Sequence, residues 1–69
     1  MPTVILNGSD HELPAGATVA DAVLAAGAPA DGRGVAVALA GEVVPRGRWA
    51  VRELADGEQV EVLHAVQGG

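Results

Sequence analysis

The residues best suited to chemistry in this chain are the two glycines at its end, Gly68 and Gly69. Glycine has no Cβ, so a diglycine tail can pass through a narrow cleft and take backbone angles that other residues avoid. With Gln67, Gly68 would form the segment threaded into a partner, bringing the Gly69 carboxylate in line with the α-phosphate of ATP. Adenylation turns a carboxylate, which is a poor electrophile, into a good one. The pattern predicts a carrier activated at its C-terminus, and a frayed end without function is the alternative.

Two apolar residues just before this tail, Leu63 and Val66, are candidates for docking a partner. If Val60 and Val62 face the core, alternation along the strand places Leu63 on the open face of the sheet. An exposed leucine beside a reactive tail would suit a partner surface. An isolated apolar residue at the surface, which is common, explains the pattern equally well.

Three arginines, Arg46, Arg48 and Arg52, lie around Trp49 in the sequence. Such a group could bind an acidic partner or a phosphate. A solvated loop with one anchored aromatic ring explains the same pattern, and we favour it because surface charges contribute little on their own. We interpret His64 as a histidine on the surface of the sheet.

The chain offers no support for an enzyme. It has no cysteine, and therefore no disulfide, thiolate ligand or cysteine nucleophile. Its two histidines, His11 and His64, have no second ligand at a metal-binding spacing, so we expect neither a metal nor a cofactor of its own. The acidic residues include no close pair that suits general acid–base catalysis. No dinucleotide-binding or phosphate-loop motif occurs, and Ser9 is the sole serine.

Length and composition predict one small domain, residues 1–66, with a tail at 67–69. A chain of 69 residues buries only about 60% of its unfolded surface, too little for both a core and a deep active-site pocket. Apolar residues make up 49% of the chain, which supports a packed globule. The net charge of −5 argues against binding nucleic acid. No apolar run suits a membrane span and no secretory pattern opens the chain, so we expect a cytoplasmic protein.

Turn dipeptides and alternating apolar residues predict the strands. Asn7-Gly8 is the strongest hairpin pattern, because a type I′ turn needs positive φ at both central residues. Ala40-Gly41 is a second turn of the same length. The predicted strands span residues 3–6, 10–13, 35–39, 42–44 and 59–63.

A helix is predicted between the two hairpins, over residues 18–26. Thr18 is expected to cap it, with Asp21 three residues on as the acid of a capping box. Gly27 should end it in a left-handed conformation. Residues 46–54 show no clean period, so we expect irregular chain with one helical turn. Either Trp49 or Val51 should reach the core, together with Leu54.

These elements predict an α+β protein, a β-grasp or ubiquitin-like roll. One main helix would lie across one face of a mixed sheet of four to five strands, which satisfies the two-layer rule. The helix then serves as a right-handed crossover. The last strand should lie centrally and parallel to the first, and the tail should leave from the end of the sheet.

Several motifs follow one another along the whole chain in a pattern typical of one family. They are Asn7-Gly8 after the first strand, Thr18-Val19 at the start of the helix, Val37–Arg46, Trp49, Leu54, Asp56-Gly57 and Val60–Gly69. The chain thereby resembles the ThiS family of sulfur carriers in thiamine biosynthesis. The most specific motifs are Gly-Glu-Val-Val-Pro-Arg at 41–46 and Ala-Val-Gln-Gly-Gly at 65–69.

The resemblance implies a mechanism and a set of partners. A ThiF-like adenylating enzyme would use ATP to activate the Gly69 carboxylate. A persulfide derived from a cysteine desulfurase would then supply sulfur, giving a C-terminal thiocarboxylate. Thiazole synthase would take this sulfur for the thiazole ring of thiamine. The chain would be a co-substrate without catalytic residues of its own.

The chain departs from the family pattern at one turn. The family usually has Asn-Gly where this chain has Ala40-Gly41, and alanine tolerates positive φ poorly, which argues against a type I′ turn there.

Two alternative functions remain. The small subunit of molybdopterin synthase shares the expected fold and tail, but this chain has no phenylalanine, and Ala65, Val66 and Gln67 precede its glycines. A ubiquitin-like interaction module with an inert tail is the alternative from another class.

Overall fold

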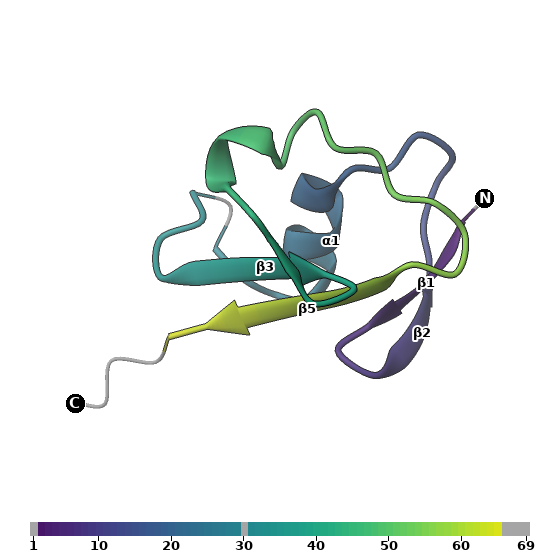
Figure 1. Ribbon diagram of the computed structural model, residues 1–69, viewed down its shortest axis with the longest axis horizontal. Coiled ribbons are helices and arrows are strands. Elements are labelled where there is room, and N and C mark those ends of the chain that lie inside the picture. The colour runs from purple at the N-terminus through teal and green to yellow at the C-terminus, as the bar shows by residue number, and fades with distance from the viewer. Residues whose placement is uncertain (1, 30, 66–69) are drawn as a thin grey trace.

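The computed structural model describes residues 2–29 and 31–65. Its elements are β1 (Thr3–Leu6), β2 (Ser9–Glu12), α1 (Val19–Ala25), β3 (Val35–Leu39), β4 (Glu42–Val44), a 3-10 turn η1 (Arg46–Arg48) and β5 (Gln59–His64). The strands form one sheet in the order β2-β1-β5-β3-β4. Figure 1 shows α1 lying across one face of this sheet.

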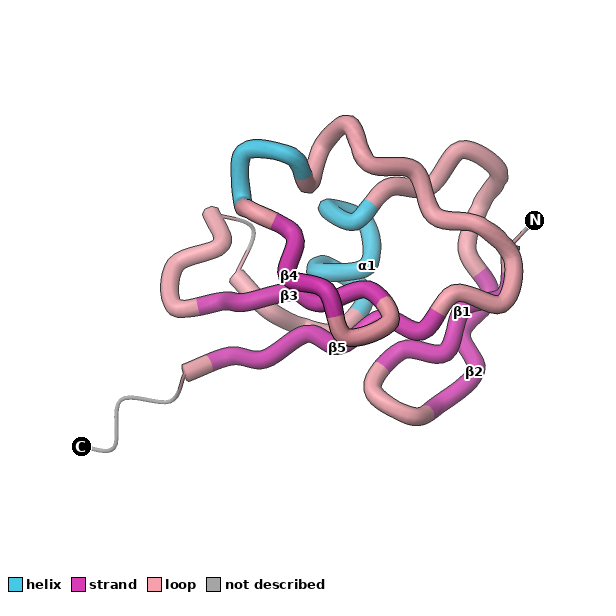
Figure 2. Tube along the Cα trace, viewed as in Figure 1, coloured by secondary structure: helices cyan, strands magenta, loops and turns pink. Residues whose placement is uncertain are grey.

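The central position of β5 organises the sheet. β5 runs parallel to β1 and antiparallel to β3, whereas both hairpins, β1–β2 and β3–β4, are antiparallel. Figure 2 shows the β1–β2 hairpin and the free end of β5 at opposite sides of the molecule. The β-grasp roll predicted from the sequence is therefore confirmed, including the parallel pairing of its first and last strands.

The core lies between α1 and the inner face of the sheet. Alternate residues of the three central strands point inward, so each strand supplies two aliphatic side chains to one layer. Removing such side chains from water is the main favourable term available to a small domain. The buried apolar residues are Val4, Leu6, Leu13, Ala17, Val19, Ala22, Val23, Val37, Leu39, Trp49, Leu54, Val60 and Val62.

Local sequence sets both ends of α1. The backbone N–H of Thr18 donates to Oδ2 of Asp21 over 2.8 Å, and the Thr18 hydroxyl donates to the same oxygen over 3.2 Å. These bonds confirm the predicted pairing at the N-terminus. At the other end Gly27 has φ +79°, a conformation that glycine adopts without a Cβ penalty.

The segment between β4 and β5 was predicted to bury either Trp49 or Val51, and the structure distinguishes the two. Trp49 and Leu54 are buried, whereas Val51 is 68% exposed. The Trp49 indole N–H donates to the carbonyl of Val44 over 2.9 Å, so the single aromatic ring is buried with its polar atom satisfied. The predicted helical turn is η1. The second strand, predicted at 10–13, begins one residue earlier, at Ser9.

The sequence argued against a type I′ turn at Ala40-Gly41, and this expectation is wrong. Ala40 has φ +49° and Gly41 φ +84°, nearly the values of Asn7 (+50°) and Gly8 (+84°) in the other hairpin. The register pairs Leu39 with Glu42, which leaves two residues for the turn. Only a primed turn matches the twist of strands joined so closely, so the pairing imposes positive φ on an alanine.

Replacing Ala40 with asparagine should therefore stabilise the protein. The left-handed conformation costs most residues about 1 kcal/mol, and asparagine tolerates it better. We expect the Ala40→Asn variant to gain roughly 0.5–1 kcal/mol in free energy of unfolding, measured with urea. Ala50→Asn is the control, because Ala50 is exposed and its φ is not positive. An equal gain in both variants would contradict the argument.

Candidate functional site

The candidate site is the end of β5, which directly precedes the proposed tail. Leu63, His64 and Ala65 are the last residues that the structure describes. Four residues proposed for the site from the sequence lie outside the described residues: Val66, Gln67, Gly68 and Gly69. The structure therefore defines the base from which the tail departs.

Main-chain pairing with β3 holds one side of this base. Leu63 lies opposite Ala36 and His64 opposite Val35. One residue further, the Ala65 N–H donates to the carbonyl of Gly34 over 2.8 Å. The ladder with β3 thus continues through the last described residue.

A side chain holds the other side. β1 pairs with β5 only at Ile5 and Leu6, and the chain then turns away at Asn7. The Asn7 side chain continues the ladder. Its Nδ2 donates to the carbonyl of Val62 over 3.2 Å, and its Oδ1 accepts from the Val62 N–H over 2.8 Å. The amide group occupies the place that a further residue of β1 would take.

Sequence reasoning assigned Asn7 to the turn alone and missed this second role. The same residue adopts positive φ in the turn and bonds a residue 55 positions away. No local pattern reveals the second role, because it depends on which strand lies beside β1. The predicted parallel pairing of the first and last strands was the one available indication.

The open face of the sheet carries an apolar patch beside the base of the tail. Leu63, 63% exposed, lies opposite Ala36, and Val43, 71% exposed, lies opposite Ala38. Side chains opposite one another share a face, so these four residues form one surface, the open-face patch. The predicted outward position of Leu63 is confirmed, since Val60 and Val62 are buried.

The loop between α1 and β3 lies beside the end of β5. Pro29, Asp31, Arg33, Gly34, His64 and Ala65 line a shallow hollow of about 530 Å³. Gly32 anchors this loop against the ring of Trp49: a Cβ there would lie 2.6 Å from the ring atom Cζ3. Arg46 adds a bond from Nη1 to the carbonyl of Asp31 over 3.2 Å. His64 is exposed here, as the sequence indicated.

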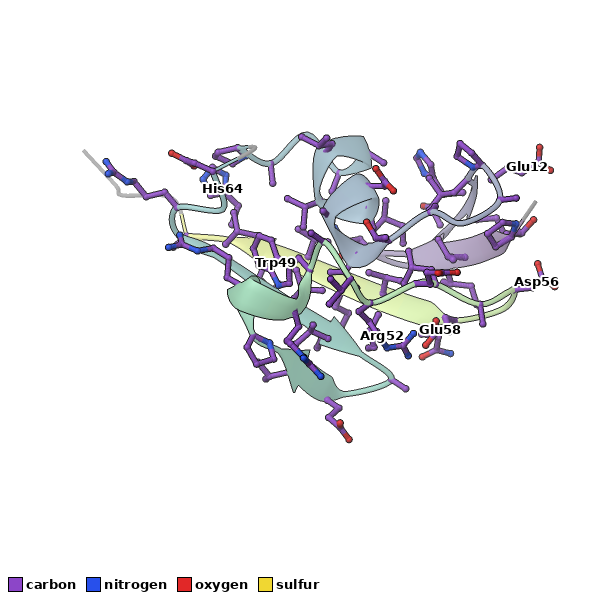
Figure 3. The ribbon with its side chains drawn as sticks, turned by 90° about the horizontal axis from the view of Figure 1, so that it is seen from above. Glu12, Trp49, Arg52, Asp56, Glu58 and His64 are labelled. Carbon is purple, nitrogen blue, oxygen red and sulfur yellow. The ribbon has the colours of Figure 1, made fainter. Side chains whose placement is uncertain are left out.

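The arginines around Trp49 do not converge on one point. Arg46 bonds the loop before β3, whereas Arg52 forms an ion pair with Glu58 over 2.7 Å. Figure 3 shows Arg52 beside Glu58, with His64 towards the opposite end of the molecule. Trp49 itself is buried. The favoured interpretation, solvated arginines around an anchored aromatic ring, agrees with this arrangement.

Within residues 2–29 and 31–65, no three His, Cys, Asp or Glu side chains are grouped so that they could hold a metal ion. Among the same residues, no helix has the length and apolar character to cross a membrane.

Comparison with known proteins finds a matching family and similar solved structures. The model of the ThiS family matches residues 4–69. The structure is similar to the crystal structure of a thiamine biosynthesis protein (ThiS) from Geobacter metallireducens, with a TM-score of 0.71 and 28% sequence identity. The alignment covers 97% of this chain and 99% of that one. A search of curated proteins gave no match.

Removing the Asn7 side chain should loosen β5 near its end. Asn7→Gly isolates this effect, because glycine keeps the positive φ of the turn and loses both bonds to Val62. We expect a loss of about 1–2 kcal/mol in free energy of unfolding, together with faster hydrogen exchange at the Val62 amide. Ala65, bonded to Gly34, serves as the internal reference. Unchanged protection of the Val62 amide would contradict this role of the Asn7 side chain.

Proposed function

Because the chain belongs to the ThiS family, we propose that it is a sulfur carrier in thiamine biosynthesis. Its Gly69 carboxylate is adenylated and then converted to a thiocarboxylate, which donates sulfur for formation of the thiazole ring. The observation that carries the proposal is the family match, which runs through the diglycine to Gly69. The similarity to a thiamine biosynthesis protein over nearly the whole chain supports it.

The chemistry balances without a catalytic group from this chain. The Gly69 carboxylate attacks the α-phosphorus of ATP and pyrophosphate leaves. The terminal sulfur of a persulfide then attacks the acyl carbon and AMP leaves. The resulting acyl disulfide is cleaved by a thiol, which becomes oxidised to a disulfide as the thiocarboxylate is released. ATP belongs to the activating partner, and the chain acts as a co-substrate and not as an enzyme.

What the chain contributes is a rigid base and a surface for its partners. β5 is held on both sides as far as Val62 and by β3 through Ala65. We assign residues 1–66 to the folded domain and 67–69 to the tail, with Gln67 and Gly68 as the threaded segment. A ThiF-like adenylating enzyme, thiazole synthase and a persulfide derived from a cysteine desulfurase are the proposed partners. The cytoplasmic location stays a prediction.

Intact mass tests the proposal. The purified chain, incubated with ATP, a persulfide donor, a thiol and the ThiF-like enzyme, should gain the mass difference between one sulfur and one oxygen. The gain should map to the peptide that ends in Gln67, Gly68 and Gly69. Deletion of Gly69 and the Gly68→Trp substitution should each abolish it without unfolding the protein. An unchanged mass with folded chain and active enzyme would contradict the carrier function.

The open-face patch is proposed, together with Val66, as the docking surface for the adenylating enzyme. Leu63→Glu should weaken binding at least tenfold, because it places a charge in an apolar contact. Leu24→Glu is the matched control, since Leu24 on α1 is 56% exposed and lies on the other side of the sheet. Binding can be measured by titration calorimetry. Equal losses in the two variants would refute docking at this face.

A further inference from the structure

The backbone groups of β5 point alternately to its two neighbours. Those of even-numbered residues face β1: Ile5 N–H donates to the carbonyl of Glu58 and Asn7 N–H to the carbonyl of Val60, over 2.8 and 2.9 Å. Val62 follows the same direction, through the Asn7 side chain. By this alternation, the N–H and carbonyl of His64 face the β1 side too.

The odd-numbered residues of the strand face β3. The carbonyl of Gln59 accepts from the Ala40 N–H over 3.0 Å, and the Ala65 N–H donates to Gly34. This ladder is complete as far as the structure describes the chain. The two sides of β5 therefore differ, with β3 covering one side to Ala65 and β1 with Asn7 covering the other only to Val62.

His64 thus presents an open strand edge. Among the described residues, no hydrogen bond reaches its N–H or its carbonyl on the β1 side. Figure 2 shows the end of β5 extending past the β1–β2 hairpin with β3 alongside it. An uncovered edge of this kind is a template for another strand. A groove of about 500 Å³ leads to it along the seam between β1 and β5, lined by Ile5, Asn7, Gly8 and residues 59–63.

We propose that the adenylating partner adds an extended segment to this edge, hydrogen-bonded to both backbone groups of His64. The inference deepens the proposed function and rests on it. If Gly69 reacts, the reacting residue lies four positions beyond Ala65. An extended chain of that length spans at most about 14 Å. The enzyme that holds the carboxylate must therefore lie against the end of β5.

Charge on the open face indicates what the added segment carries. Glu61 lines the groove, and Asp10 lies opposite Ile5 on the same face. Both are acidic, and the chain has a net charge of −5. A partner segment whose basic side chains reach from its paired backbone into this groove complements these charges. Backbone bonds would then supply the alignment of the tail, and the open-face patch the contact area.

Hydrogen exchange of the full chain, free and bound to the ThiF-like enzyme, tests this inference. In the free chain the His64 amide should exchange quickly, while those of Val62 and Ala65 are protected. In the complex the His64 amide should become protected at least tenfold. Continued fast exchange at His64 in a complex that still loads sulfur would overturn the edge pairing and leave the carrier function standing. Absence of both loading and protection would overturn both.

A proline at position 64 provides a second test. His64→Pro removes the outward N–H without removing a described sheet bond, and edge positions of this kind accept proline. His64→Ala, which keeps the N–H, is the reference. We expect binding to the enzyme to be about five- to tenfold weaker for the proline variant than for the alanine variant. Protection of the Ala65 amide verifies that the sheet is intact, and equal affinities of the two variants would overturn the proposal.

Discussion

Pairing of β5 on both of its sides is the interaction on which the rest of the structure depends. β1 and β3 are the inner strands of two separate hairpins, and β5 alone joins them into one sheet. The same strand places Val60 and Val62 in the core, so its register sets the packing as well. A shift by one residue would exchange these valines with Glu61 and Leu63. The position of the end of β5 and the burial of the core are therefore fixed together.

The single aromatic side chain of the core, Trp49, packs against the loop before β3. Trp49 is buried in the core and its indole N–H bonds the Val44 carbonyl. Gly32 lies against the ring, where a Cβ would not fit. This contact seats the loop before β3, whose Gly34 carbonyl receives the Ala65 N–H. A packing contact of the indole ring is thus connected through one loop to Ala65, the last described residue before the proposed tail.

Much of the fold follows from local sequence, and the features that sequence reasoning missed share one physical cause. The strands at 3–6, 35–39 and 42–44 and the cap at Thr18 depend on neighbours in the chain, so alternation and turn residues predict them. The positive φ of Ala40 and the hydrogen bonds of the Asn7 side chain to Val62 are imposed by strand pairing, which no local pattern contains. The site shows the same division, since the outward position of Leu63 was predictable and the open edge at His64 was not.

The shortness of β1 explains how a sheet this small can combine stability with access. A longer β1 would cover His64 and add hydrogen bonds, but it would close the edge at which we propose that the partner pairs. Asn7 extends the pairing by one position with a side chain and then lets the chain turn away. The uncovered edge is short, and Glu61 in the groove that leads to it opposes pairing between copies of the chain, because like charges repel. A basic partner segment meets no such repulsion, so the same charges that protect the edge select what can pair with it.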